Sequence, residues 1–197
     1  MASATKMLVR HGLSSANDRR NFGKPAFAHP DASLMVRGCY DAMGVGEALK
    51  ANGYDGDPSV SRVAVSTMLR TGQTALYAGF RPAAITEYAV LDEVDHDLDP
   101  FVLGRMIKAG VYPDAALIRA DRLLDTLPDE DVYVTHGLLG SAALYLAGVG
   151  RDTDQPFIPR FASVRVLRYD SEKRLCLEEA IMEQRRLWHE HDKNDCE

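Results

Sequence analysis

The chain has 197 residues, a formal net charge of −6 at pH 7, 46% hydrophobic residues and 26% charged residues. These values are typical of one soluble globular domain and exclude a disordered or collagen-like chain. The negative charge disfavours general binding to nucleic acid or anionic membranes, so an anionic substrate requires a local cationic pocket. No apolar run approaches the roughly 18 residues of a membrane span, and the run ending at Val9 is too short for a signal-peptide core. The three cysteines show no CxxC spacing, so we expect a cytoplasmic protein with reduced thiols.

Short β-rich runs alternate with helical patterns along the chain. We predict strands over residues 7–9, 62–66, 131–135 and 164–169, and helices near 42–51, 69–78, 114–127 and 138–147. Asp114 can cap its helix, and Gly148 can end the last one. This alternation predicts one domain over residues 1–197, with an α/β fold: a three-layer α/β/α sandwich around a mostly parallel sheet.

Two segments have no regular pattern. Residues 18–40 are rich in Gly and Pro and are predicted to form a long loop or lid. This segment carries a cluster of four cations, which either form a solvated rim or contact the substrate: Arg19, Arg20, Lys24 and Arg37. The tail over 183–197 is strongly polar and is expected to be helical or frayed.

Charged side chains follow three of the predicted strands. The first strand continues into Arg10 and His11, the second leads to Arg70, and the third continues into His136. In an open α/β sheet the ligand crevice lies beyond the carboxyl ends of the strands. If the strands are parallel, two arginines and two histidines meet in one pocket, which suits a dianion such as phosphate. Gly137 opens the next helix, whose free amides also favour an anion.

The same stretches resemble the motifs of the histidine phosphatase superfamily, also called phosphoglycerate-mutase-like. The run from Leu8 to Asn17 is similar to its RHGxSxxN signature, and the run from Ser66 to Ala75 is similar to its second motif, SxxxRTxQTA. Leu91-Asp92-Glu93 resembles its LxE element, and the sequence around His136 resembles its final signature. The motifs occur in family order over residues 8–137 and imply a phosphoglycerate-mutase-like fold.

The resemblance implies a phosphomonoester hydrolase with a role for each matched residue. His11 would be the nucleophile that becomes a phosphohistidine, and Glu93 would protonate the leaving oxygen and then activate water. The transferring phosphoryl group would be held by Arg10, Arg70 and His136. Asn17 would bind a phosphate oxygen or orient the first loop. We expect a small phosphorylated substrate and no cofactor.

Three alternatives remain open at this stage. A mutase would return the phosphoryl group to another oxygen, but only 43 positions separate Glu93 from His136, where cofactor-dependent mutases carry a long insertion. A catalytically idle module would only bind a phosphorylated ligand. A metal-dependent hydrolase would use the acidic stretch over 92–99, although nothing there fixes a ligand geometry and we expect a solvated loop instead.

Overall fold

The computed structural model describes residues 5–17, 29–126, 129–148, 161–169 and 175–182. The strands are β1 (Thr5–Arg10), β2 (Val63–Val65), β3 (Ile85–Glu87), β4 (Val132–Thr135), β5 (Val164–Tyr169) and β6 (Leu175–Met182). The α-helices are α1 (Val36–Ala51), α2 (Leu69–Tyr77), α3 (Pro100–Lys108), α4 (Asp114–Asp125) and α5 (Gly137–Leu146). Short 3-10 turns are η1 (Ser15–Asn17), η4 (Pro82–Ala84) and η5 (Ala89–Leu91).

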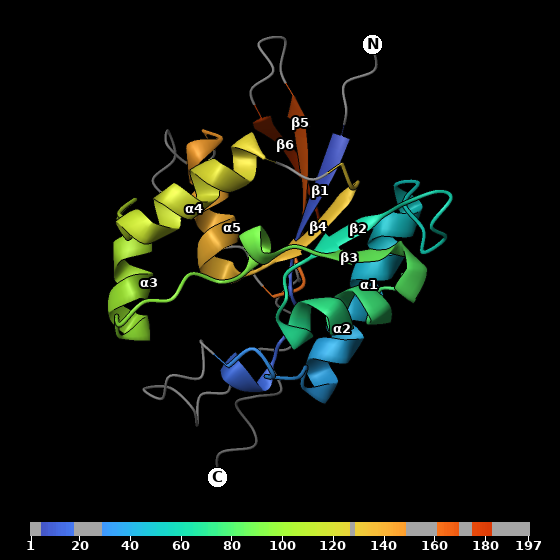
Figure 1. Ribbon diagram of the computed structural model, residues 1–197, viewed down its shortest axis with the longest axis horizontal. Helices are drawn as coiled ribbons and strands as arrows, with labels where there is room; N and C mark the ends of the chain where they lie inside the picture. The colour runs from blue at the N-terminus through green and yellow to red at the C-terminus, as the bar shows by residue number, and fades with distance from the viewer. Residues whose placement is uncertain (1–4, 18–28, 127–128, 149–160, 170–174, 183–197) are drawn as a thin grey trace.

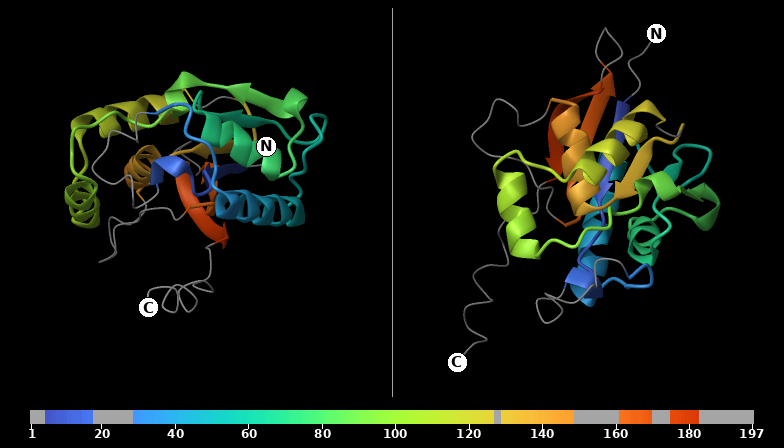
Figure 2. Two further views of the ribbon diagram at one scale, coloured as in Figure 1. Left: turned by 90° about the horizontal axis from the view of Figure 1, so that it is seen from below. Right: turned by 60° about the vertical axis from the view of Figure 1, so that its left-hand side comes forward.

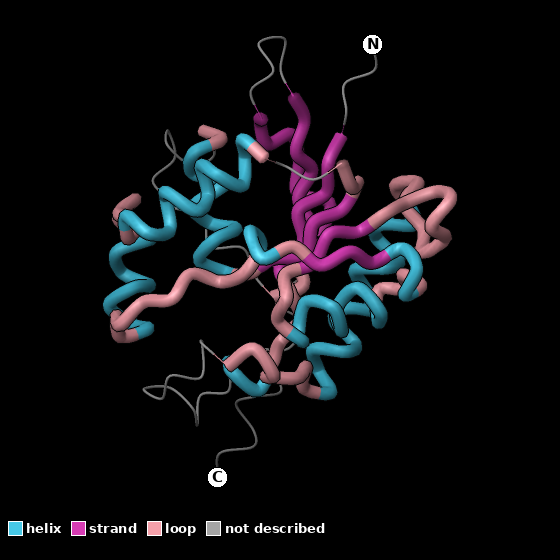
Figure 3. The backbone as a smooth tube through the Cα atoms, in the orientation of Figure 1, coloured by secondary structure: helices cyan, strands magenta, loops and turns pink. Residues whose placement is uncertain are grey.

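The strands form one sheet between two groups of helices (Figures 1 and 3). The strand order is β3-β2-β4-β1-β5-β6; the pairs among β1 to β4 are parallel, and β5 and β6 pair antiparallel. This arrangement confirms the predicted mostly parallel sheet.

The two faces of the sheet belong to two separate hydrophobic clusters, because side chains alternate along a strand. On β1, Met7 and Val9 pack with α1 and α2, whereas Leu8 between them packs with α3, α4 and α5. Val132 and Val134 of β4 likewise face α1 and α2, and Tyr133 faces the other way. Figure 2 shows the same separation from two further directions. The three-layer α/β/α architecture is therefore confirmed.

Three elements were not predicted from the sequence: β3, β6 and α3. The capping role expected for Asp114 is also wrong. Pro113 is the N-cap and Asp114 is the first helical residue, with no side-chain capping bond; its carboxylate lies in the first turn, where negative charge favours a helix. Gly148 ends α5 as expected, with a positive φ of 86° directly after the C-cap residue Ala147.

The loop predicted over residues 18–40 ends earlier than expected, because α1 begins at Val36. The glycine that suggested a loop has a packing role instead. A Cβ on Gly38 would lie 2.0 Å from the backbone oxygen of Leu13, so the first turn of α1 contacts the chain after β1 at backbone distance. Arg37 therefore lies in α1, and residues 18–28, with Arg19, Arg20 and Lys24, are outside the described residues, as is the 183–197 tail.

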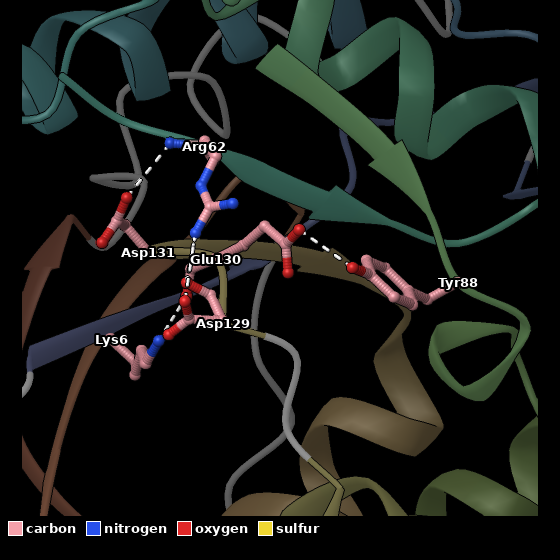
Figure 4. A network of polar contacts seen from close by, with 6 residues as sticks. All are labelled: Lys6, Arg62, Tyr88, Asp129, Glu130 and Asp131. Atoms are coloured by element: carbon pink, nitrogen blue, oxygen red, sulfur yellow. Dashed lines mark hydrogen bonds and ion pairs between the residues drawn. The ribbon is translucent and has the colours of Figure 1, made fainter. Parts of the chain in front are cut away.

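A polar network links Lys6 of β1 and Tyr88, which follows β3, to the segments that precede β2 and β4 (Figure 4). Lys6 donates to the backbone oxygen of Glu130 at 2.6 Å, and the Tyr88 hydroxyl donates to Glu130 Oε1 at 2.9 Å. Arg62 binds Asp131 through its backbone N–H and Asp129 through its guanidinium. Lys6, Arg62 and residues 129–131 lie at the amino ends of β1, β2 and β4, away from the carboxyl ends that the predicted site residues follow. In the part of the chain described, no helix combines the length and apolar character needed to cross a membrane.

Candidate active site

The predicted site residues converge at the carboxyl ends of the parallel strands. Arg10 is the last residue of β1 and pairs in register with Thr135, so His11 and His136 follow adjacent strands at the same level. Arg70 is the second residue of α2, which starts shortly after β2. Three motifs far apart in sequence thus meet because their strands are parallel neighbours.

A cavity of about 240 Å³ lies at this edge. One part of its wall carries charged and polar side chains, and another part is apolar and comes from α3, α5 and Phe161. The lining residues are Arg10, His11, Ala16, Asn17, Arg70, Glu93, His96, Leu103, Gly104, Ile107, Gly137, Leu138 and Phe161.

His11 is held as a neutral imidazole with one defined tautomer. Its Nδ1 lies 2.7 Å from the backbone oxygen of Gly12, and because a carbonyl only accepts, Nδ1 carries the hydrogen. Burial, together with the charges of Arg70 and Arg10, lowers the pKa of His11 well below its usual 6.5. The Nε2 lone pair is therefore available for nucleophilic attack at neutral pH.

Two arginines provide fixed positive charge at the cavity. Burial lowers the pKa of Arg10 to about 10, so its guanidinium stays charged at neutral pH; its Cζ lies 3.9 Å from the centre of the Phe161 ring. Burial also lowers the pKa of Arg70, whose Nη1 donates to the backbone oxygen of His29 at 3.1 Å. Arg10 is thus held against Phe161 of the cavity wall, and Arg70 is held by a backbone oxygen outside the lining residues.

His136 is fully buried beside His11, with the two ring centroids 5.0 Å apart. Its Nε2 lies 2.8 Å from Ser66 Oγ, at the end of β2. Burial and the nearby His11, Arg70 and Arg10 lower its pKa well below 6.5. The unliganded protein therefore holds two neutral histidines near two charged arginines.

The Glu93 side chain lies at the amino end of α5, where the sequence predicted that free amides would bind an anion. Its carboxylate accepts from the backbone N–H groups of Leu138 and Leu139 at 3.1 Å each, and from its own neighbour Val94. These α5 amides were expected to face the phosphate; instead a carboxylate satisfies them, as negative charge at a helix amino end does. Glu93 also lines the cavity, so it is anchored next to the site of reaction.

Two carboxylates of the acidic stretch after Leu91 accept hydrogen bonds from nearby groups of the chain. Asp92 accepts from the backbone and hydroxyl of Thr67, and Asp99 caps α3 by accepting from the backbone of Phe101 and Val102. Among the described residues, no group of three or more His, Cys, Asp or Glu side chains is arranged to hold a metal ion.

Two of the predicted binding residues line the cavity, and three lie outside the described residues. Asn17 lines the cavity, and its Oδ1 accepts from Ser14 Oγ at 2.7 Å. Gly137 also lines it and lies against Arg10. Arg19, Arg20 and Lys24 lie outside the described residues, so their contact with substrate stays a prediction.

Sequence reasoning missed the apolar wall of the cavity. Phe161 lies 24 residues beyond Gly137 in no recognisable motif, so no sequence signal marks it. The α3 side chains had a signal: an Asp-Pro pair, typical of a helix start, precedes Leu103 and Ile107 at helical spacing.

Residues 7–98 match the family described as "Histidine phosphatase superfamily (branch 1)". Among solved structures, an Entamoeba histolytica phosphoserine phosphatase in complex with 3-phosphoglyceric acid is 16% identical, with a TM-score of 0.67, and the alignment covers 91% of this chain and 98% of that one. A putative α-ribazole-5′-P phosphatase from Escherichia coli is 18% identical with a TM-score of 0.62, covering 90% and 96% of the two chains.

The protein histidine phosphatase SixA, complexed with tungstate, is 14% identical with a TM-score of 0.53, covering 89% of this chain and 95% of that one. No curated protein sequence matches the chain. At these identities the structural likeness establishes the fold. The match over residues 7–98 confirms the resemblance of the motifs within that range, and the signature around His136 lies beyond it.

Proposed function

Because residues 7–98 match the histidine phosphatase superfamily, we propose that this chain hydrolyses small phosphomonoesters through a phosphohistidine on His11. The observation that carries the proposal is the state of His11: a neutral ring, with Nδ1 bound to Gly12 and Nε2 left to attack, beside two charged arginines. A buried neutral histidine with only a structural role would not need two charged arginines beside it.

In the first step His11 Nε2 forms a bond to phosphorus while the bond from phosphorus to the leaving oxygen breaks. Glu93 gives its proton to that oxygen, so the leaving group departs as an alcohol. Arg10 and Arg70 stabilise the negative charge that develops on the phosphoryl oxygens. In the second step Glu93 takes a proton from water, the resulting hydroxide attacks phosphorus, and the bond to Nε2 breaks.

The cavity also supports a class of substrate. Opposite the charged groups, Leu103 and Ile107 of α3 and Leu138 of α5 offer an apolar surface to the leaving group. A volume of about 240 Å³ is small for a ligand site, where about 300–1,000 Å³ is common. We therefore favour a compact monoester with a partly apolar leaving group.

A rapid-quench experiment tests the proposal. Mixing the enzyme with ³²P-labelled aryl phosphate should trap an acid-labile, base-stable phosphoenzyme, and His11→Ala should lose both the trapped species and turnover while keeping its circular dichroism spectrum. Normal labelling of His11→Ala would refute His11 as the nucleophile. An idle binding module would bind phosphate without releasing any from esters.

The same experiment separates hydrolysis from mutase chemistry. A hydrolase transfers the label from the phosphoenzyme to water, and the rate does not depend on an added alcohol phosphate. A mutase needs a second phosphorylated alcohol and returns the label to it.

A further inference from the structure

A closed set of buried hydrogen bonds links His136 to the first turn of α2. Ser66, Thr71 and His136 are each at most 1% exposed. Ser66 Oγ lies 2.8 Å from His136 Nε2 and 3.0 Å from Thr71 Oγ1, and it accepts from the Met68 N–H at 3.1 Å. Thr71 Oγ1 in turn lies 2.7 Å from the Met68 carbonyl oxygen and 3.0 Å from that of Ser66.

The chemistry of these groups assigns the protons. A carbonyl oxygen only accepts, so the 2.7 Å contact with Met68 uses the single hydroxyl proton of Thr71. Thr71 Oγ1 then accepts in its contact with Ser66, which makes the Ser66 hydroxyl the donor there. With its proton used, Ser66 Oγ accepts from His136, so the hydrogen of this contact is on Nε2.

The opposite assignment leaves a short contact without a proton. If Ser66 donated to His136 Nε2, the single hydroxyl hydrogen of Thr71 would be needed for two contacts, one with Ser66 Oγ and one with the Met68 carbonyl oxygen. In one of these two contacts, two buried oxygen atoms would then face each other with no hydrogen between them. Burying polar atoms without a hydrogen bond is energetically unfavourable. The network therefore selects one tautomer of the neutral ring.

The selected tautomer leaves a lone pair on His136 Nδ1. This atom is buried and has no hydrogen-bond partner in the part of the chain that the structure describes. An oxygen of a phosphoryl dianion also only accepts, so it cannot bond to an unprotonated Nδ1.

We propose that Ser66 and Thr71 are positioning residues that hold free His136 as the Nε2–H tautomer, so that binding of a phosphoryl dianion brings one proton onto Nδ1. The inference rests on the proposed function, because it takes a phosphoryl group as the ligand at Nδ1. The proton comes from solvent and forms an imidazolium that donates to Ser66 through Nε2 and to the ligand through Nδ1.

The groups around the ring explain why the proton arrives with the ligand. His11 after β1, Arg10 on β1 and Arg70 on α2 all oppose a positive charge on His136, and burial adds to their effect on its pKa. The carboxylate of Glu93 lies at the same cavity but is committed to the α5 backbone. A dianion bound at His11, whose ring centroid lies 5.0 Å from that of His136, supplies negative charge near the buried ring and favours its protonated form.

Histidine ¹⁵N NMR of the free protein tests the tautomer without reference to activity. We expect the Nε2–H pattern for His136 in the parent enzyme. In Thr71→Val the Ser66 proton loses its acceptor at position 71 and turns to His136, so the signal should shift toward Nδ1–H, and Thr71→Ser should restore the parent pattern. Thr126→Val is the matched control, since Thr126 also donates to a backbone carbonyl, at 2.6 Å, but at the exposed end of α4. An Nδ1–H pattern in the parent enzyme, or no change in Thr71→Val, overturns the inference.

Calorimetry with methylphosphonate tests the proton, because the dianion of this ligand has no hydroxyl and its oxygens only accept, like those of a phosphate ester. At about pH 8.5, where the free ligand is mainly a dianion, the binding enthalpy is measured in buffers of different ionisation enthalpy. The parent enzyme and Thr126→Val should take up about one proton per bound phosphonate, and Thr71→Val close to none, because its Nδ1 already carries a hydrogen. Phosphonate binding to the parent enzyme without proton uptake overturns the inference but leaves the proposed function intact. If the parent enzyme binds neither methylphosphonate nor inorganic phosphate, the proposed function fails, and the ligand part of the inference fails with it.

Discussion

The guanidinium of Arg10 occupies the space that a side chain on Gly137 would need. A Cβ at Gly137 would lie 2.9 Å from both Cζ and Nη2 of Arg10. Arg10 also contacts the Phe161 ring, so the guanidinium has little room to move away. The missing side chain at position 137 is therefore what allows a fixed cation to lie at the amino end of α5.

Gly137→Ala tests the position of Arg10. The methyl group should displace Arg10 and lower kcat/KM by about tenfold or more, which corresponds to about 1.4 kcal/mol. Stability should fall by about 1–3 kcal/mol, because the added Cβ lies 2.9 Å from a guanidinium that has little room to move away. Gly72→Ala is the control, since a Cβ there meets nothing within 4 Å and should leave kcat/KM unchanged. Full activity of Gly137→Ala would show that the Arg10 position does not matter.

Glu93→Gln tests the proton donor through its dependence on the leaving group. A general acid contributes about 10²–10⁴-fold, and it matters most for poor leaving groups. Single-turnover rates with alkyl phosphates should therefore fall far more than rates with nitrophenyl phosphate. The amide NH₂ also replaces an acceptor facing α5, so the free energy of unfolding should drop by about 1–3 kcal/mol. Equal losses for both leaving groups would contradict the acid role and make Asp95 the next residue to test.

The parts of the fold that the sequence predicted are those with strong local patterns. The apolar parts of β1 and β4 are buried on both faces, and each strand is followed directly by a histidine of the site. Their parallel pairing brings Arg10 and His136 together, so the central site could be inferred from the strand ends alone. β3 has only three residues, mostly exposed, and such a short segment at the sheet edge has no detectable alternation.

The features that sequence reasoning missed depend on long-range packing. Gly38 is a residue type that suggests a loop, but here its missing side chain allows α1 to lie close to the backbone of Leu13. The α5 amides are satisfied by Glu93, 45 positions away from Leu138, which no local pattern reveals. Phe161 reaches Arg10 from a segment without a motif.

The two buried histidines predict how stability depends on pH. Their pKa values are well below 6.5 in the folded state, whereas the unfolded chain titrates near 6.5. Below pH 6.5 the unfolded state therefore binds more protons, and stability should fall as the pH falls, by at most about 1.4 kcal/mol per pH unit for each histidine. Above that pH this contribution is constant.

Denaturant unfolding at about pH 7.5 and about pH 5.5 measures this effect. His11→Asn should reduce the loss of stability between the two pH values, because one depressed histidine is removed. An identical loss in His11→Asn would contradict a neutral His11 in the folded protein.

Gly104→Leu tests the apolar wall as the site of the leaving group. Gly104 lies in the middle of α3 and lines the cavity, and a Cβ there meets nothing within 4 Å, so a side chain can start from this position without a backbone clash. Replacing glycine within a helix should raise stability by up to about 1 kcal/mol. The KM for a bulky aryl phosphate should nevertheless rise about tenfold, equivalent to about 1.4 kcal/mol of binding. Inhibition by inorganic phosphate, which has no leaving group, should stay nearly unchanged, and Gly104→Ala should lie between the parent and Gly104→Leu. Equal weakening of phosphate and aryl phosphate would mean that α3 borders the phosphoryl position rather than the leaving group.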